Sequence, residues 1–341
     1  MGPTGNPEEP VLATTIDKYC YLTCRYLPPF FQHKIRVVYS TIENCRSVDE
    51  IQHPAVREVV RFLNIDRGLE IHHDGDLPAR SGMGSSSSFT VGLLHALHGL
   101  MGQMPSKEQL AAESIEVEQE RLKEAVGSQD QVSAAYGGFN RILFHENGTF
   151  SRQPMTLPQE CVRELNSHLM LFYTGIQRTA STVARSYVED ISPERQATLR
   201  TFRGMVDEAI SILTKGRDLT AFGKLLHEAW VAKQSLSNSV SNARVAEIYE
   251  RARAEGAIGG KLTGAGGGGF MLLFAPPSTH ARMRQVLHKL IHVPFAFESA
   301  GSQIILFDRE QEYPAEERAR ITQVISDFRE LSPTRDSGSS V

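Results

Sequence analysis

A glycine- and serine-rich stretch contains the residue types in this sequence that are best suited to binding phosphate. Residues 78–89 read PARSGMGSSSSF, after an alternating run at 69–73 that is typical of a strand and before a helical pattern at 90–98. Gly82 and Gly84 allow a tight turn that brings the backbone close to a ligand. Free N–H groups and the positive end of a helix dipole then point at the same place. The stretch predicts a phosphate site, with serine hydroxyls available to a metal ion.

A mobile loop is the alternative interpretation, because flexible linkers have a similar composition. A linker is seldom inserted between a strand and an amphipathic helix, which favours the binding loop. Two other phosphate-binding patterns are excluded. No Gly-Lys-Ser or Gly-Lys-Thr follows the glycines, as a Walker A loop requires, and the spacing is not that of G-x-G-x-x-G.

A second glycine-rich stretch lies far along the chain, where residues 261–269 read KLTGAGGGG. It connects two short runs, 258–263 and 270–274, that are typical of strands. Consecutive glycines lose much backbone entropy on folding, and a structural turn needs only one or two of them. A loop held close to a ligand explains them better than a mobile linker does. The two glycine loops could therefore converge on one ligand.

Two acidic side chains could complete such a site. Asp130 lies in GSQDQ, residues 127–131, at a predicted helix start, where an aspartate often serves only as a cap. Glu118 and Glu120 precede it on an acid-rich helical pattern at 107–123. Most acids on such a helix are solvated, but one on the inward face could meet the serine loop. Hard oxygen ligands of this kind suit a divalent cation.

Composition bounds the class of protein. The 341 residues are 40% hydrophobic and 22% charged, as in a globular protein, and the net charge of −4 gives no electrostatic case for nucleic acid or an anionic membrane. No apolar run reaches membrane-spanning length, and residues 1–10 lack the basic and apolar parts of a signal peptide. The spacing of a zinc site is missing from the four cysteines, Cys20, Cys24, Cys45 and Cys161. We therefore expect reduced thiols and a cytoplasmic location.

The remaining patterns predict a mixture of strands and helices. The other strand-like runs lie at 11–27, 35–39, 139–144, 150–155, 168–173 and 303–307, with Asn147-Gly148 as a hairpin turn. The other helical patterns lie at 54–63, 192–215, 218–236, 242–254 and 280–292. Strands and helices are grouped rather than strictly alternating, which favours an α+β fold.

Taken together, these motifs resemble the GHMP small-molecule kinases, the family of galactokinase, homoserine kinase, mevalonate kinase and phosphomevalonate kinase. The resemblance covers residues 11–307 and rests on the order and spacing of PARSGMGSSSS, Glu118, GSQDQ and KLTGAGGGGF. Within the family the chain is most similar to bacterial D-glycero-D-manno-heptose 7-phosphate kinases, through ATTIDKY, GSQDQVSAAYGGFN and FYTG. Fucokinase-type enzymes share parts of these motifs.

The resemblance implies two α+β lobes, with the nucleotide and the sugar in the cleft between them. A ribosomal-S5-like, ATP-binding lobe is expected over residues 1–155 and a ferredoxin-like lobe over 156–310, followed by a helical or disordered tail at 311–341. The implied reaction is ATP- and Mg²⁺-dependent phosphorylation of the anomeric hydroxyl of a sugar. The expected substrate is D-glycero-D-manno-heptose 7-phosphate, which would become the 1,7-bisphosphate. Another sugar such as fucose, or a non-catalytic nucleotide- or sugar-binding relative, is the alternative.

The resemblance also implies a role for each motif residue. The ATP phosphates are expected to contact the first glycine loop, through Pro78, Arg80, Ser81, Gly82, Met83, Gly84, Ser85, Ser86 and Ser87. Ser86 and Glu118 match the Mg²⁺ ligands, with Glu120 as the alternative glutamate, and Asp130 matches the acid that faces the accepting hydroxyl. The segment that closes over substrate and phosphate corresponds to Gly264, Ala265, Gly266, Gly267 and Gly268.

A sugar that already carries a phosphate would need a basic pocket. Lys18, Arg80 and Arg178 are the candidates for it, and a solvated charge is the alternative for each. The expected partner is therefore a small sugar or sugar phosphate, with no nucleic acid and no membrane. A homodimer is compatible with the sequence.

One departure from the family pattern concerns the start of the chain. Family members begin with a strand and a glycine-rich loop ending in Gly-Gly-Thr-Asp or similar, which contacts the sugar. Here residues 11–16 correspond to the strand that follows, and residues 1–10 stand where the first motif would precede it. The chain is either truncated or a divergent member. In both cases we expect the neighbouring strand to have an unpaired edge.

Overall fold

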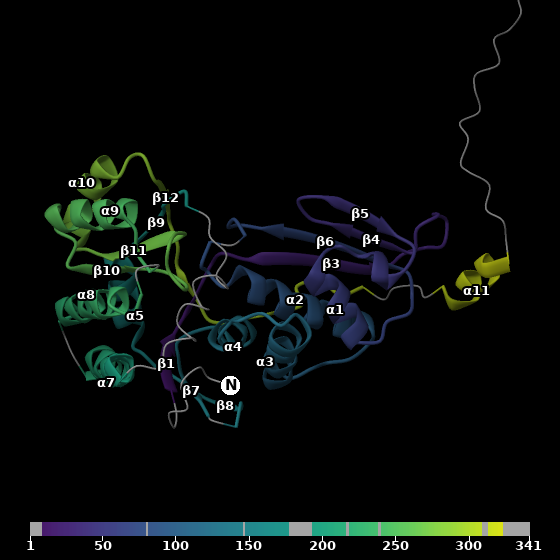
Figure 1. The fold of residues 1–341 in the computed structure, drawn as a ribbon, viewed down its shortest axis with the longest axis horizontal. Coiled ribbons are helices and arrows are strands. Elements are labelled where there is room, and N and C mark those ends of the chain that lie inside the picture. Colours follow the sequence, from purple (N-terminus) through teal and green to yellow (C-terminus); the bar gives the residue numbers. More distant parts are fainter. Residues whose placement is uncertain are drawn as a thin grey trace, which may run out of the picture.

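The computed structural model describes residues 9–79, 81–145, 147–176, 193–215, 218–237, 240–308 and 313–322. Two groups of helices and strands lie side by side along the long axis of the molecule (Figure 1). The first group holds the elements from β1 to β8, and the second holds those from α5 to β12.

The first group is built on a four-stranded sheet with the order β3-β6-β4-β5. Its strands are β3 Cys20–Tyr26, β6 Leu69–Gly75, β4 Ile35–Val38 and β5 Ile42–Cys45. Only the β4–β6 pair is parallel. Among the described strands β3 pairs only with β6, so it forms an edge of the sheet. The expectation of an unpaired edge next to the first family motif stays a prediction.

Helices lie on one side of this sheet (Figure 1). They are α1 Pro54–Phe62, α2 Ser85–Leu100, α3 Lys107–Glu116 and α4 Gln129–Tyr136, and α2 packs against β3. Helix α2 is central, because its Val91, Leu93, Leu94 and Leu97 have no exposed surface. Burying an aliphatic side chain of this size contributes roughly 2 kcal/mol. These side chains therefore fix the position of α2, which begins directly after the serine-rich loop.

The helix predicted at 107–123 has an irregular second half. After α3, residues Val117–Arg121 form a π-helical turn, η2, that contains Glu118. An extra residue in a helical turn changes the direction in which the following side chains point, and such turns are frequent at functional sites.

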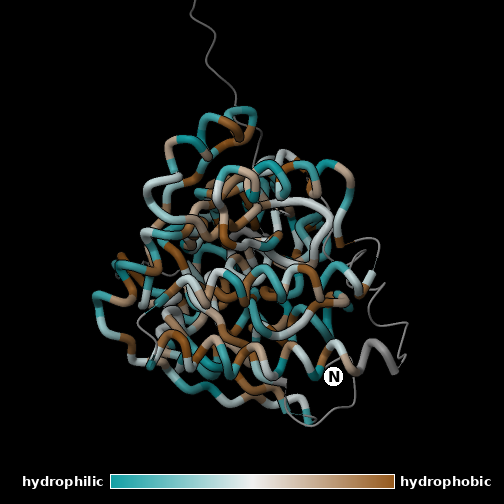
Figure 2. Tube along the Cα trace, turned by 90° about the vertical axis from the view of Figure 1, so that its left-hand side faces the viewer, coloured by the Kyte–Doolittle hydropathy of each residue, from teal (hydrophilic) through white to brown (hydrophobic). Residues whose placement is uncertain are grey.

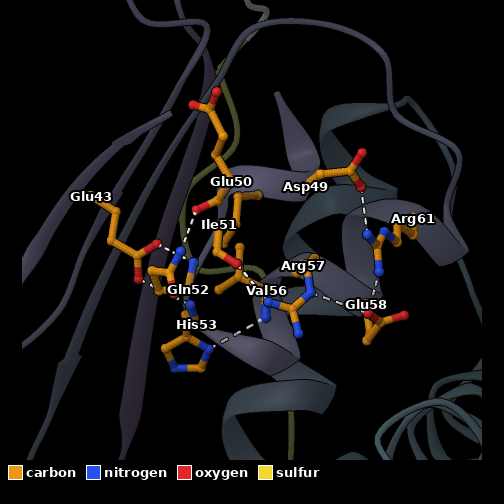
Figure 3. Close-up of polar contacts among 10 residues, drawn as sticks. All are labelled: Glu43, Asp49, Glu50, Ile51, Gln52, His53, Val56, Arg57, Glu58 and Arg61. Carbon is orange, nitrogen blue, oxygen red and sulfur yellow. Dashed lines mark hydrogen bonds and ion pairs between the residues drawn. The ribbon is translucent and has the colours of Figure 1, made fainter. Parts of the chain in front are cut away.

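Polar contacts fix the turn that leads from the sheet into α1 (Figure 3). This turn includes the short helix η1 Val48–Glu50. The Glu43 carboxylate accepts hydrogen bonds from the backbone N–H groups of Gln52 and His53, at 2.6 and 3.0 Å. The ring of His53 then accepts a hydrogen bond from the N–H of Val56, in the first turn of α1. The start of α1 is thus tied to β5.

Two smaller sheets complete the first group. One has the antiparallel order β1-β7-β8, with β1 Glu9–Ala13, β7 Asn140–Phe144 and β8 Phe150–Pro154. The hairpin predicted around Asn147-Gly148 is confirmed, because β7 and β8 are adjacent and antiparallel. The other sheet pairs β2 Thr15–Ile16 with β13 Phe297–Glu298, which returns the end of the second group to the first.

The second group is an antiparallel sheet with the order β10-β11-β9-β12 and several helices. Its strands are β9 Leu169–Tyr173, β10 Gly259–Leu262, β11 Phe270–Phe274 and β12 Ile291–Val293. Its helices are α5 Gln159–His168, α7 Pro193–Lys215, α8 Thr220–Gln234, α9 Ala243–Ala254, η3 Pro277–Thr279 and α10 His280–Val286. The core of this group contains Met170, Phe172, Trp230 and Met271.

Two expectations about the C-terminal part are wrong. The helix predicted at 280–292 ends at Val286, and residues 291–293 form β12 instead, because they pair with β9. Residues 303–307 form no strand, since no neighbouring strand pairs with them. Helix α11 Pro314–Thr322 follows, where a charged helix was expected.

Hydrophilic and hydrophobic residues are interspersed along the Cα trace in Figure 2. Within the described part of the chain, every helix is too short or too polar to cross a membrane.

Candidate active site

The first glycine loop turns through two left-handed residues and then starts α2. Gly82 and Gly84 have φ angles of 77° and 69°, in the region that favours glycine. Gly84 occupies the N-cap position, and no side chain caps the helix there. The N–H groups of the first turn, at Ser85, Ser86 and Ser87, have no acceptor within the helix. They form a positive helix end suited to an anion.

The two glycine loops lie directly against each other, as the sequence predicted. A methyl group on Gly264 would come within 2.7 Å of the Cα of Gly82. A methyl group on Gly269 would come within 2.0 Å of the carbonyl oxygen of Ser81. Both distances are far below a normal carbon contact, so backbone-to-backbone packing excludes a side chain at these positions. The contact between the loops is therefore one reason why these positions require glycine.

Backbone hydrogen bonds hold the second loop in place. The N–H of Gly267 donates to the Val240 carbonyl at 2.8 Å, and the N–H of Gly269 donates to the Ile176 carbonyl at 2.8 Å. The carbonyl of Gly269 accepts from the N–H and the hydroxyl of Thr174, at 2.9 and 2.8 Å. These bonds argue against the interpretation of this loop as a mobile linker.

Glu118 is buried beside the start of α2, with 1% of its surface exposed. The hydroxyl of Ser87 donates to its Oε2 atom at 2.9 Å, and the side chain of Gln131 donates to the same oxygen. The Oε1 atom is buried and has no hydrogen-bond partner among the described residues. Burial raises the pKa of this carboxyl group to about 7, against the hydrogen bonds that it accepts. A cation at Oε1 would favour the ionised form.

The structure does not bring every predicted metal residue to this carboxylate. The hydroxyl that contacts Glu118 belongs to Ser87, while Ser86 is exposed. Glu120, the alternative glutamate, is exposed and lies 3.5 Å from Lys123 in an ion pair. Among the described residues no group of three His, Cys, Asp or Glu side chains could hold a metal ion alone.

Asp130 lies at the other side of the first loop. It is the second residue of α4, so it does not occupy the N-cap position, which belongs to Ser128. A methyl group on Gly84 would come within 3.2 Å of the carboxyl carbon of Asp130. The carboxylate is therefore packed against the left-handed turn at the start of α2. Burial raises the pKa of Asp130, and the electrostatic effect of Lys261 and Lys233 opposes that shift.

Two lysines complete the surroundings of Asp130, and the sequence patterns did not identify either. Lys233 lies near the end of α8, and its ammonium group donates to the carbonyl of Gly264. Burial lowers its pKa to about 7, and the charge of Lys261 acts in the same direction. Lys261 lies in β10, where burial lowers its pKa against the effect of Asp130. The position of Lys261 just before the glycines of the second loop could have identified it as a site residue. No sequence pattern marks Lys233.

The other predicted residues differ in their burial and in their partners. Ser81 is buried, and its hydroxyl and that of Thr263 have no hydrogen-bond partner among the described residues. Met83 is half-buried and Pro78 is exposed. Arg80 and Arg178 lie outside the described residues. Lys18 is paired with Asp17 at 2.9 Å.

A cavity of about 540 Å³ lies beside β3 rather than at the loop junction. Edge strand β3, one side of α2 and residues 298–308 line it, and Lys18 contributes to the same lining. Three of the residues that line this cavity, Ile305, Leu306 and Phe307, are apolar and exposed.

Comparisons with known proteins agree with this geometry. The model of the GHMP kinases N terminal domain matches residues 51–138, and that of the GHMP kinases C terminal part matches residues 208–292. The chain is 29% identical over 235 residues to D-glycero-alpha-D-manno-heptose 7-phosphate kinase of Campylobacter jejuni, covering 68% of this chain and 69% of that enzyme. It is 31% identical over 229 residues to mevalonate kinase of Pyrococcus horikoshii, covering 64% and 62%. The matches thus span about two thirds of these relatives.

The fold is also similar to solved structures. A D-glycero-D-manno-heptose 1-phosphate kinase from Bacteroides thetaiotaomicron has a TM-score of 0.68 at 22% identity, covering 86% of this chain and 88% of that one. This likeness confirms the predicted two-lobed α+β fold, while the lobe boundaries at residues 155 and 310 stay predictions. The chain belongs to the GHMP kinase family, whose members use ATP as the phosphate donor.

Proposed function

We propose that this protein is a sugar kinase that transfers a phosphoryl group from ATP to the anomeric hydroxyl of a sugar or sugar phosphate. The observation that carries the proposal is the position of the Asp130 carboxyl group beside Gly84, at the start of α2, within 3.2 Å of where a methyl group on Gly84 would lie. On one side of this position lies a helix N-terminus, which favours phosphate oxygens. The other side is a carboxylate, which can accept a proton from an alcohol. A phosphate donor and a hydroxyl acceptor can therefore meet here.

In the proposed reaction the acceptor oxygen attacks the γ-phosphorus of ATP. The new oxygen–phosphorus bond forms while the bond between the γ-phosphorus and the bridging oxygen breaks, and ADP leaves with that electron pair. Asp130 accepts the hydroxyl proton. The N–H groups of residues 85–87 and the second glycine loop hold the phosphates, because this type of transfer depends mainly on positioning and charge neutralisation.

We propose Ser86 and Glu118 as the residues that would hold Mg²⁺. The fit rests on the buried Oε1 atom of Glu118, which has no hydrogen-bond partner among the described residues. Ser87 and Gln131 bind the other oxygen and so orient the carboxylate. One carboxylate and one hydroxyl leave the remaining positions to phosphate oxygens and water, as is usual for Mg²⁺. The ion supplies neutralisation of the phosphate charge.

The substrate that we propose is D-glycero-D-manno-heptose 7-phosphate, because the Campylobacter jejuni kinase for this substrate is 29% identical over 235 residues, or 68% of this chain. Another sugar such as fucose and a non-catalytic binding protein are the alternatives. We place the protein in the cytoplasm, where ATP is present and its four free cysteines stay reduced. The homodimer stays a prediction.

Release of ADP, measured with a coupled assay over a panel of sugars and sugar phosphates, tests the proposal. We expect turnover with the heptose 7-phosphate and a 1,7-bisphosphate as the product. Asp130→Asn is expected to lower kcat by about 10²–10⁴-fold, the usual contribution of a general base. Its affinity for MgADP should stay within about twofold, since Asp130 faces the acceptor.

Asp49→Asn is the matched control, because Asp49 is exposed and its ion pair is with Arg61, far from the loop junction in the sequence. It should leave both turnover and MgADP affinity unchanged. Full activity of the Asp130→Asn variant would contradict the role of Asp130. Failure of the parent protein to bind MgADP would contradict the kinase function itself.

A further inference from the structure

Two lysines approach Asp130 from the second group of elements, on α8 and on β10. We propose that Lys233 and Lys261 together form the anion site that holds the transferred phosphoryl group beside Asp130. The inference rests on the proposed function, since it assigns this site to the γ-phosphate of the nucleotide.

The position of Lys261 is the first argument. It is the third residue of β10, three residues before Gly264, and the residue is partly exposed at the surface although burial lowers its pKa. No hydrogen bond or ion pair links its ammonium group to any described residue, although Asp130 acts on it electrostatically. Three N–H donors are therefore available beside the proposed base.

The single bond of Lys233 is the second argument. Its ammonium group donates to the carbonyl of Gly264, the residue whose backbone lies on Gly82. The lysine thus reaches the junction of the two loops, next to the first residues of α2. Its two remaining N–H donors have no acceptor among the described residues.

The balance of charge is the third argument. Two lysines act on one carboxylate, and the charge of Lys261 also acts on Lys233. Burial disfavours the charged form of both lysines, and repulsion by Lys261 adds to this at Lys233. One carboxylate, Asp130, compensates only one of the two cations. A phosphoryl group with its negative oxygens would supply the missing charge and would meet the loop N–H groups at the same point.

Nucleotide affinity measured by calorimetry separates this role from a structural one. MgADP and MgAMPPNP differ by the γ-phosphoryl group, and we expect the parent protein to bind MgAMPPNP more tightly. Lys233→Met and Lys261→Met should each reduce this preference by about tenfold or more, the effect of losing one hydrogen bond to a charged group. Their affinity for MgADP should change by less than about twofold.

Thermal unfolding provides the second readout. A lysine that served the fold would lower the unfolding temperature when replaced, whereas removal of an uncompensated buried charge should leave it unchanged or raise it. Lys261→Arg keeps the charge and should restore part of the preference for MgAMPPNP. Lys224→Met is the matched control, because Lys224 lies on α8 and is exposed.

The outcomes distinguish the inference from the function on which it rests. Absence of MgADP binding in the parent protein would overturn both. Normal MgADP binding with an unchanged MgAMPPNP preference in the lysine variants would overturn only the anion site. An equal affinity of the parent protein for the two nucleotides would also overturn it. Loss of the preference together with a lower unfolding temperature in both variants would assign the lysines to the fold instead.

Discussion

Helix α2 connects two regions that differ in how tightly they are packed and in how fully their backbone is paired. At its start, the two glycine loops pack so tightly that a methyl group on Gly269 would come within 2.0 Å of a carbonyl oxygen. Along its side lies a cavity of about 540 Å³, open against β3. The loop junction leaves no room for an added carbon atom. The β3 side leaves an edge strand with only one neighbour among the described strands.

This difference in packing indicates that the functional groups are preorganised at the loop junction and not on the β3 side. The loop junction holds the groups of the proposed phosphate chemistry in fixed positions, through backbone hydrogen bonds and close packing. Its geometry should therefore tolerate little change. The β3 side is open, and its exposed residues should tolerate changes that the junction does not.

The largest effect is expected from Gly269→Ala. Gly269 has a φ angle of 95°, and its methyl group would overlap the Ser81 carbonyl. Strain and overlap should lower the free energy of unfolding by about 2 kcal/mol or more. Because the two loops would separate, affinity for MgADP should fall as well. Chemical denaturation and calorimetry measure the two effects.

Gly102→Ala is the matched control, because Gly102 also has a positive φ angle, 73°, but nothing lies within 4 Å of an added methyl group. It should show only the backbone strain, about 1 kcal/mol, with unchanged MgADP affinity. Equal losses in the two variants would mean that the contact between the loops contributes nothing.

Much of the junction was predictable from the sequence because its signals are local. Glycines at 82, 84, 264 and 266–269 indicate loops whatever surrounds them, and Asp130 follows from its place at a helix start. The hydrogen bond from Ser87 to Glu118 depends on the phase of α2, which brings this serine to the carboxylate. That phase could not be read from four consecutive serines.

The missed residues depend on packing between distant segments. Lys233 reaches Gly264 only because α8 packs next to β10, and an isolated lysine in a helix shows no such contact. The strand expected at 303–307 failed for the opposite reason. Its apolar pattern is local, but a strand also requires a neighbour that pairs with it.

An intermediate effect is expected from the pH dependence of stability at the junction. The pKa of Lys233 is lowered from 10.5 to about 7, mainly by burial. Between these two values the unfolded chain binds more protons than the folded one, so stability rises with pH. Relative to Lys233→Met, the parent protein should gain roughly 2 kcal/mol of unfolding free energy between pH 7 and pH 9.

Chemical denaturation without nucleotide at both pH values measures this gain. Lys261 and Asp130 also act on Lys233, and both are present in the parent and in the variant. Their own contributions largely cancel in the difference. Lys224→Met should show the pH dependence of the parent protein, since that lysine is exposed. A constant difference between the parent and Lys233→Met would show that Lys233 titrates at its ordinary pKa.

The smallest effect is expected on the β3 side of the molecule. Leu306 is 85% exposed, so Leu306→Ser should change the free energy of unfolding by less than about 0.5 kcal/mol. Ile304 is the matched comparison, because its Cδ1 atom packs against Gly99 of α2 and it is only 41% exposed. Ile304→Ser should cost about 1–2 kcal/mol, from the apolar contact that it loses. MgADP affinity should stay unchanged in both variants, and a loss of affinity in Leu306→Ser would show that the open side and the loop junction are coupled through α2.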